Sequence, residues 1–303
     1  MPSLLLTGAR GFVGARLAAR LSTREESLLK AEERLGGPQT VDWSPQLADC
    51  RCVVHLAARV HVMRETAADP LESFRAVNTE GTLDLARQAA AAGVRRFLFV
   101  SSVKVNGEST APGRPFRHDD RPQPLDPYGV SKREAEDGLR EIAASSGMEI
   151  VIVRPPLVYG PGVRANFAAM VRAVRRGLPL PLGSVTHNRR SLVALDNLVD
   201  LLVTCIDHPA AAHQTFLVSD GEDLSTAELL RRLGQAMGRP ARLLPLPPAL
   251  LRVGAALLGQ REVAQRLLGN LQVDIAHTRE TLGWTPPLSV DDALRQTVAG
   301  LSS

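Results

Sequence analysis

The sequence predicts an α/β fold in which a doubly wound parallel sheet is followed by a smaller, discontinuous C-terminal domain. Short apolar runs alternate with helical runs from Ser3 to about Tyr159, which is the pattern of parallel strands joined by crossover helices. Further along the chain this alternation stops. The length of 303 residues also exceeds a usual single core and suits two domains. We expect residues 1–160 and 190–220 to form the sheet domain, and residues 161–189 and 221–303 to form the second domain.

The composition is that of an ordinary soluble globular chain, with 44% apolar and 22% charged residues. The net charge of +4 comes from scattered arginines, which favours an anionic small ligand over nucleic acid. Cys50, Cys52 and Cys205 have neither metal nor disulfide spacing, and the histidines show no metal-ligand spacing. With no long apolar run and no leader segment, we expect a cytoplasmic protein without a metal and without a membrane partner.

The first strand and the turn after it predict a phosphate-binding site. Ser3–Thr7 reads as a short buried strand, and a glycine turn and a helix to about Leu21 follow it. Glycines allow the tight turn and the close approach of backbone to a pyrophosphate, while the helix N-terminus supplies free N–H groups. An ordinary glycine-rich turn is the alternative. The predicted cofactor residues here are Gly8, Arg10, Gly11, Phe12, Val13 and Gly14.

The next segment is compact, and we place a second strand near Leu28–Ala31 and a third near Thr40–Val41. The residue just past the second strand selects the dinucleotide, because an acid pairs with the ribose 2′-OH and a base with a 2′-phosphate. Acidic and basic residues both occur here, so the sequence is compatible with NAD and with NADP. Asp42 is expected to meet the adenine amine or to be a turn residue. The charged candidates are Lys30, Glu32, Glu33 and Arg34.

Two further strands are expected to end at the same edge of the sheet. Cys52–Ala58 reads as a buried strand, in which His55 is expected to be a satisfied core residue. A helix from Asn78 to Ala92 leads to the strand Arg96–Val100, which ends at Ser101 and Ser102. Ligands bind at the carboxyl ends of parallel strands, so Ser102 should face the ligand.

Tyr128 and Lys132 form the candidate acid/base pair. Residues four apart lie on one face of a helix. An ammonium about 4 Å from a phenol favours the phenolate by roughly 4 kcal/mol at an effective dielectric of ~20, so we expect Lys132 to lower the pKa of Tyr128. Chance spacing on a solvated helix is the alternative. The chain has only three lysines and two tyrosines, which argues against chance.

The second half of the chain reads as mostly helical. We expect an amphipathic helix over Asn166–Arg176, a strand over Phe216–Asp220 that returns to the sheet, and a helix over Ser225–Met237 capped by Ser225 or Thr226. A largely apolar helix should start near Ala249, after a proline-rich connection.

These residues together resemble the extended short-chain dehydrogenases/reductases of the nucleotide-sugar epimerase and dehydratase kind. The resemblance implies a Rossmann-like fold that binds NAD or NADP, a UDP-sugar substrate and a homodimer. The segment between Gly14 and His55 departs from most relatives by being shorter. The motifs are Thr7-Gly8-Ala-Arg-Gly11-Phe-Val-Gly14, His55-Leu-Ala-Ala58, Asn78, Ser101-Ser102, Tyr128-x-x-x-Lys132, Arg154-Pro-Pro-Leu-Val-Tyr-Gly160 and Leu282-Gly-Trp-x-Pro286.

The resemblance also assigns roles to residues of this chain. It makes Tyr128 the catalytic acid or base, Ser102 its partner on the sugar oxygen, and Lys132 a ribose ligand. It extends the cofactor site to Asp42, Leu56, Ala57, Ala58, Asn78, Lys132 and Pro155. The implied substrate residues are Lys104, Asn106, Asn166 and Arg189, the last as a clamp on the diphosphate, with a solvated arginine as its alternative.

The expected reaction is hydride transfer at C4 of a UDP-hexose or UDP-N-acetylhexosamine in surface polysaccharide synthesis. Dehydratases of the family carry an acid and a base directly after the residue matching Ser102, where this chain has Val103 and Lys104, so dehydration is not expected. The short segment after Gly14, and Leu157 where an epimerase would have asparagine, favour a 4-keto-sugar reductase. A UDP-sugar 4-epimerase and a non-catalytic NAD(P)-binding regulator are the alternatives.

Overall fold

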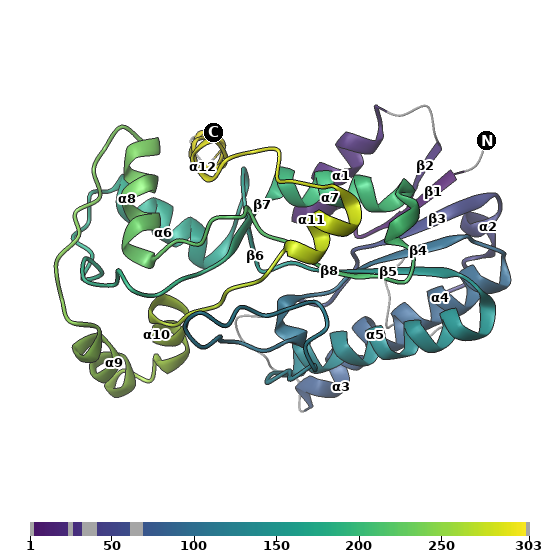
Figure 1. Ribbon diagram of the computed structural model, residues 1–303, viewed down its shortest axis with the longest axis horizontal. Coiled ribbons are helices and arrows are strands. Elements are labelled where there is room, and N and C mark those ends of the chain that lie inside the picture. Colours follow the sequence, from purple (N-terminus) through teal and green to yellow (C-terminus); the bar gives the residue numbers. More distant parts are fainter. Residues whose placement is uncertain (1–2, 24–26, 32–40, 61–68, 301–303) are drawn as a thin grey trace.

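The computed structural model describes residues 3–23, 27–31, 41–60 and 69–300. These residues form a six-stranded sheet in the order β2-β1-β3-β4-β5-β8, in which every pairing is parallel. The sheet runs through the right half of the molecule, with helices on both faces (Figure 1). This confirms the predicted doubly wound fold. The strands are β1 (Ser3–Thr7), β2 (Ser27–Lys30), β3 (Cys50–His55), β4 (Arg96–Val100), β5 (Glu149–Arg154) and β8 (Thr215–Leu217).

Alternating side chains divide the core into two layers. Leu4 and Leu6 of β1 pack under α1 (Phe12–Leu21) and α7 (Leu195–Asp207), whereas Leu5 points to the other face. That face is covered by α2 (Ser44–Leu47), α4 (Gly81–Ala91) and α5 (Pro127–Ser146). Successive side chains of a strand point to opposite faces, so continuous apolar strands are stable only when both faces are covered.

Several predicted boundaries differ from the observed ones. Thr40 lies outside the described residues, and Val41 is not in a strand, so the chain enters β3 directly after α2. The predicted strand to Ala58 ends at His55. The helix expected from Asn78 begins earlier, because α3 (Pro70–Arg75) and a π-helical turn (Ala76–Glu80) continue into α4. Asp69 caps α3 by accepting a hydrogen bond from the Glu72 N–H, a start signal that the sequence contained.

The second half of the chain builds a helical lobe around a short parallel pair, β6 (Leu157–Tyr159) and β7 (Leu192–Ala194). Three helices share one apolar cluster there: α6 (Ala165–Arg175), α8 (Thr226–Ala236) and α12 (Val290–Ala299). Ser225 caps α8, as one of the two predicted residues. The remaining helices are α9 (Pro248–Leu257), α10 (Arg261–Leu268) and α11 (Ala276–Leu282), with 3₁₀ turns at Val103–Val105 and Pro209–Ala211.

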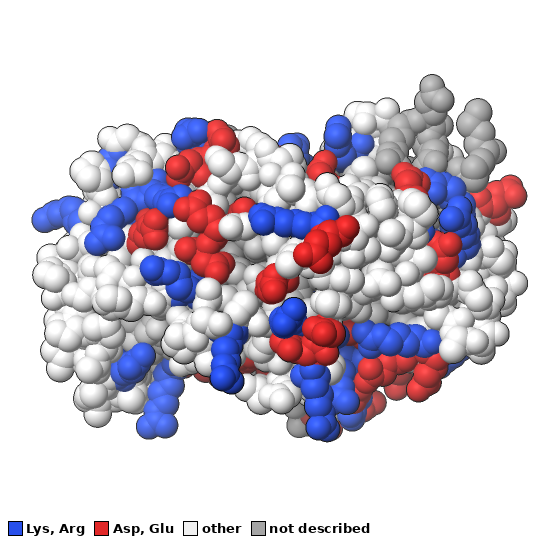
Figure 2. All heavy atoms as spheres, in the orientation of Figure 1, with Lys and Arg blue, Asp and Glu red and all other residues white. Residues whose placement is uncertain are grey.

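The described surface mixes charges of both signs. Figure 2 shows basic and acidic side chains interspersed over the face drawn. Within the described ranges, none of the helices combines the length and apolar character needed to cross a bilayer. The proposed division into two domains stays a prediction, although β8 does return to the sheet from the second half of the chain.

Candidate active site

Gly8, in the turn between β1 and α1, and Gly14, in the first turn of α1, leave no room for a side chain. Gly8 has φ +70, and a Cβ there would lie 2.7 Å from the Ala57 nitrogen. A Cβ on Gly14 would overlap the carbonyl oxygen of Gly8. The first N–H groups of α1 have no partner within the helix and point out of its N-terminus. This glycine-lined cradle fits the pyrophosphate of a nicotinamide dinucleotide, whose adenosine and nicotinamide halves would extend to either side.

His55 fixes the loop that borders this cradle. Its ring nitrogens lie 2.8 Å from the Thr7 hydroxyl and 3.0 Å from the Thr82 hydroxyl. Burial lowers the pKa of His55 to about 3, with a smaller contribution from the charge of Lys132. The Thr7 oxygen also accepts the Ala57 N–H at 3.1 Å. His55 is therefore a neutral, satisfied core residue, as expected, and its contacts hold Leu56, Ala57 and Ala58 next to the glycine turn.

Asn78 also holds this loop. Its side chain is buried, accepts the Arg59 N–H at 2.8 Å, and donates to the Arg59 carbonyl and to the Ser131 hydroxyl, both at 3.0 Å. These contacts join the loop after β3 to helix α5. We therefore interpret Asn78 as a positioning residue of the cofactor site.

Three other predicted cofactor residues lie in different surroundings. Arg10 is exposed at the glycine turn. Pro155 is buried after β5, where its carbonyl accepts the Val103 N–H at 3.0 Å. Asp42 is exposed, and its carboxylate accepts the Ser44 N–H at 3.0 Å; hydrogen bonds from the Ser44 side chain and then from this N–H lower the pKa of Asp42. This geometry is that of the turn residue that the sequence offered as an alternative.

The catalytic helix α5 begins beside the end of β4. Its N-cap, Asp126, accepts the Gly129 N–H at 2.7 Å. Burial raises the pKa of Tyr128, and the Asp126 carboxylate raises it further, to about 12. A side-chain hydrogen bond from Ser102 opposes this rise. The structure thus brings Ser102 to Tyr128 as predicted, and the phenol carries its proton at neutral pH.

Lys132 differs from the expectation. The residue is 1% exposed, and its ammonium donates to the Val100 carbonyl at 2.9 Å and lies 4.2 Å from the centre of the Phe99 ring. Burial lowers the pKa of Lys132 to about 7, and the nearby Glu136 carboxylate opposes that change. The expected lowering of the Tyr128 pKa is not seen in this structure, because desolvation weakens the charge of Lys132 and also disfavours the phenolate.

Two of the predicted substrate residues, Lys104 and Asn106, have protein partners in the structure. Lys104 pairs with Asp126 and, at 3.1 Å, with Glu108. Asn106 is buried, and its amide bonds to the Arg154 guanidinium at 3.1 Å and to the Arg117 carbonyl at 3.1 Å. Because both ends of this amide already have protein partners, we interpret Asn106 as a positioning residue rather than a substrate ligand.

The other two substrate candidates are exposed. Asn166 lies in the first turn of α6. Arg189 donates through Nη1 to the carbonyls of Thr186 and Asn188, at 3.0 and 3.1 Å. These contacts hold its side chain against its own loop and leave its position compatible with a phosphate ligand.

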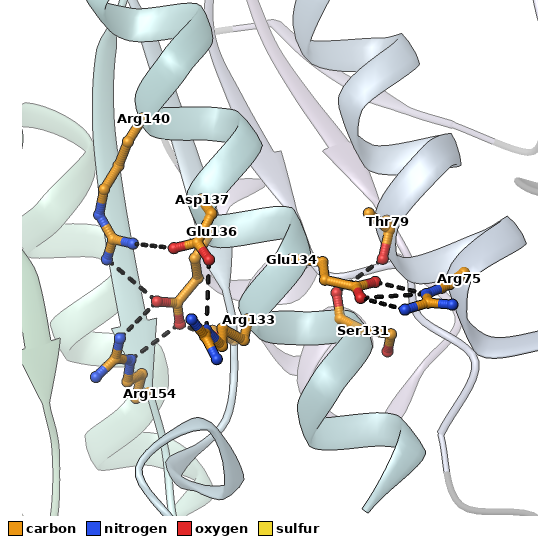
Figure 3. Close-up of polar contacts among 10 residues, drawn as sticks. Arg75, Thr79, Ser131, Arg133, Glu134, Glu136, Asp137, Arg140 and Arg154 are labelled. Carbon is orange, nitrogen blue, oxygen red and sulfur yellow. Dashed lines mark hydrogen bonds and ion pairs between the residues drawn. The ribbon is translucent and has the colours of Figure 1, made fainter. Parts of the chain in front are cut away.

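Two groups around the catalytic helix escaped the sequence analysis. Phe74 of α3 meets Tyr128 edge-on, with ring centres 6.0 Å apart. The buried pair of Glu136 and Arg154 lies one turn beyond Lys132 (Figure 3). The spacing Tyr128, Lys132, Glu136 places all three on one helix face, and this signal could have found the glutamate.

Comparisons with known proteins agree with this geometry. Residues 4–219 match the model of the NAD dependent epimerase/dehydratase family. The chain is 49% identical to a UDP-glucose 4-epimerase of Vibrio cholerae, over 97% of this chain and 94% of the relative. It is 30% identical to a UDP-glucose 4-epimerase of Mycolicibacterium smegmatis, over 97% and 96%. A GDP-6-deoxy-D-mannose reductase of Pseudomonas aeruginosa is 28% identical, over 96% and 94%.

Solved structures support the fold. The structure of RMD from Pseudomonas aeruginosa complexed with NADPH superposes with a TM-score of 0.78 at 23% identity, over 99% of both chains. UDP-glucose 4-epimerase from Thermotoga maritima with UDP-glucose has a TM-score of 0.79 at 20% identity, over 99% of this chain and 98% of the other.

The parallel sheet with its glycine cradle is that of an α/β protein fit to bind a nicotinamide dinucleotide, NAD or NADP, and Ser102, Tyr128 and Lys132 are its candidate catalytic residues. The matched family model and the relatives place it more narrowly. The chain belongs to the NAD dependent epimerase/dehydratase family.

Proposed function

We propose that this enzyme is a 4-epimerase of a UDP-hexose or UDP-N-acetylhexosamine. The observation that carries the proposal is the 49% identity, over nearly the whole chain, to a UDP-glucose 4-epimerase, together with the presence of the full catalytic set. This reverses the order of the two enzyme interpretations drawn from the sequence, which favoured a 4-keto-sugar reductase. The regulator alternative fails, because the family and the catalytic residues are those of an enzyme.

The chain's own residues supply the proton chemistry. Tyr128 lies beside Ser102 at the carboxyl edge of the sheet, where the 4-hydroxyl of the sugar would approach both hydroxyls. Tyr128 carries its proton in this structure; once it has lost that proton, the phenolate removes the proton from the C4 oxygen and later returns it, while Ser102 orients that oxygen. Lys132, which does not lower the pKa of Tyr128 in this structure, is the proposed ribose ligand. A nicotinamide dinucleotide held at the cradle of Gly8, Gly11 and Gly14 would supply the acceptor and donor of the C4 hydride.

The contacts of Val103 and Lys104 support C4 chemistry without dehydration. Loss of water from a sugar needs an acid and a base besides the tyrosine. Val103 is buried and apolar, and the Lys104 ammonium is paired with Asp126 and Glu108. Neither side chain can transfer the additional proton, so hydride transfer at one ring carbon remains.

The diphosphate and the sugar are proposed to lie between the sheet and the helical lobe. Arg189 is the proposed diphosphate ligand, because a guanidinium binds phosphate with two parallel hydrogen bonds. Asn166 is proposed to line the same space. On this proposal residues 161–189 and 221–303 supply the nucleotide-sugar side, residues 1–160 and 190–220 supply the dinucleotide side, and two chains form a homodimer in surface polysaccharide precursor synthesis.

A second candidate is a reductase of a UDP-linked 4-keto-6-deoxy sugar. Leu157 favours it, because this side chain is 47% exposed in β6 and offers no hydrogen bond to a uracil. A reductase would receive its ketone from another enzyme and release oxidised cofactor in each turnover.

Assays of the purified protein distinguish the 4-epimerase from the 4-keto-sugar reductase. Interconversion of UDP-glucose and UDP-galactose, or of the two N-acetylated epimers, without added cofactor is expected for the epimerase. Bound NAD should then survive gel filtration. Consumption of NADPH that depends on a UDP-4-keto-6-deoxy sugar, without epimer interconversion, would instead establish the reductase.

A further inference from the structure

Glu136 and Arg154 form an ion pair that is shielded from solvent beside the catalytic residues. The Glu136 side chain is 0% exposed and the Arg154 side chain 2%. Arg154 Nε and Nη2 donate to the two carboxylate oxygens at 2.9 and 2.5 Å. Removing two charges from water is costly, and a buried ion pair is often no more stable than apolar residues of similar volume. Stability alone therefore gives a weak reason for its presence.

The contacts of this pair reach every element that carries a catalytic group. The Ser101 hydroxyl donates to Glu136 at 2.6 Å, one residue before Ser102. Arg154 Nη1 donates to Asn106 at the end of the 3₁₀ turn that follows Ser102. The pair thus joins α5, the carboxyl ends of β4 and β5, and the loop after Ser102.

Helix α5 is held against β4 at two successive residues. Lys132 donates to the Val100 carbonyl and Glu136 accepts from Ser101. Tyr128, Lys132 and Glu136 follow each other at intervals of four, so they lie on one helix face. The contacts of Lys132 and Glu136 therefore both hold the helix face that carries Tyr128 against the end of β4.

We propose that Glu136, held by Arg154, is a positioning residue for the reaction: it fixes Tyr128 and Lys132 against Ser102 and keeps a negative charge next to the Lys132 ammonium. This inference rests on the proposed hydride-transfer function. The direction of the shifts supports it. Burial alone would raise the pKa of Glu136. Arg154, with smaller contributions from Ser101 and Arg140, outweighs burial and holds this pKa below its usual value, so the carboxylate stays charged.

Other charged groups near Lys132 do not supply this effect. His55 of β3 faces Lys132 and is neutral, with a pKa of about 3. Tyr128 on α5 is protonated at neutral pH, and β4 presents the Phe99 ring and the Val100 carbonyl. Arg154, at the end of β5, carries a positive charge, and its ion pair with Glu136 compensates that charge. The described surroundings thus place one anion, Glu136, where it raises the pKa of Lys132.

The same helix provides a matched control. Glu134 forms an equally bidentate pair with Arg75, at 2.6 to 3.1 Å, on a different part of α5 (Figure 3). That pair is partly exposed and joins α5 to α3. Glu134→Gln should leave kcat and the pKa of Lys132 unchanged.

The test uses Glu136→Gln and the double variant Glu136→Met with Arg154→Met. Glu136→Gln leaves Arg154 buried without its anion, so the unfolding midpoint should fall. The double variant removes both charges and should recover the midpoint. If the pair positions the catalytic groups, kcat of the recovered double variant stays about 10²-fold below the wild-type value, with KM for the sugar unchanged. Recovery of kcat together with stability would overturn the proposal.

A second readout requires no substrate. Because the chain has three lysines, Lys30, Lys104 and Lys132, protein with ¹³C-labelled lysine should give three titration curves, and a Lys132→Arg sample identifies one of them. The pKa of Lys132 should fall in the double variant and not in Glu134→Gln. An unchanged Lys132 pKa in the double variant would refute the proposal that Glu136 keeps a negative charge next to the Lys132 ammonium. Failure of the wild-type protein to interconvert sugar epimers would refute the proposed function alone, since this titration would still decide the role of Glu136.

Discussion

Gly14 and Gly254 both lie inside helices, and the space around them differs completely. A Cβ on Gly14, in α1, would overlap the Gly8 carbonyl oxygen, whereas a Cβ on Gly254, in α9, would meet no atom within 4 Å. The difference extends to the regions around them. The cofactor side is close-packed backbone and buried polar side chains, while every residue of α9 is described and none is buried. Substitutions should therefore change activity or stability strongly on the cofactor side and weakly in α9.

The largest effect on activity is expected from Tyr128→Phe, which removes the acid/base hydroxyl on the close-packed cofactor side. A positioned acid or base contributes on the order of 10²–10⁴ in rate, and kcat should fall by that factor. Affinity for NAD, measured by fluorescence titration, should stay the same because Lys132 is untouched.

The other tyrosine serves as the control. The Tyr159 hydroxyl donates to Asp220 at 2.8 Å, and this tyrosine is buried away from Ser102. Tyr159→Phe should cost about 1–3 kcal/mol of unfolding free energy and leave kcat near the wild-type value. Retention of more than about a tenth of the activity in Tyr128→Phe would show that another group transfers the proton.

Gly14→Ala probes the packing of the cradle directly. The added methyl cannot avoid the Gly8 carbonyl without moving the backbone, and overpacking of this kind costs about 3 kcal/mol. We expect a lower unfolding midpoint in the absence of ligand and a weaker affinity for NAD. Unchanged stability and affinity would mean that the turn can relax, contrary to the contrast drawn above.

The buried Lys132 predicts an increase of stability with pH. Its pKa is about 7 in the folded protein and near 10.5 ordinarily, so between these values the unfolded chain binds more protons. The free energy of unfolding then rises with pH by about 1.4 kcal/mol per unit. Urea unfolding at pH 7.5 and at pH 9 should show a gain of roughly 2 kcal/mol in the wild-type protein relative to Lys132→Met. Equal slopes for the two proteins would contradict a lowered pKa.

The smallest effect is expected from Gly254→Ala in α9. Alanine has the higher helix propensity and here has free space, so the substitution should raise the free energy of unfolding by about 0.4–1 kcal/mol. Thermal unfolding measures it. A loss of stability would show that α9 packs more tightly than its exposure indicates.

Local patterns in the sequence were enough to locate the glycine turn and the pair of Tyr128 and Lys132. The glycine turn follows a strand directly, and Tyr128 and Lys132 lie one helical turn apart, so neighbouring residues determine both features. The roles of Lys104 and Asn106 depend instead on Asp126 and Arg154, which reach them only in the folded chain. The family resemblance implied both as substrate residues, and the sequence alone does not show these partners.

The electrostatics of Lys132 were missed for a related reason. Spacing places an ammonium beside a phenol, but it does not report how dry the surroundings are. Burial shifts both groups toward their neutral forms, and the Val100 carbonyl draws the ammonium away. The third strand was misplaced because so short a segment has no usable periodicity.

The late position of β8 in the chain has a consequence for synthesis on the ribosome. Until Thr215–Leu217 has emerged, the outer edge of β5 has no strand to pair with. Leu282 and Trp284 complete the same core layer, and the Trp284 indole donates to Asp200 of α7 at 2.9 Å. A nascent chain therefore carries an open strand edge and uncovered apolar surface through most of its translation. Fragments that end before β8 should aggregate, and chaperones that shield such edges should matter most during that interval.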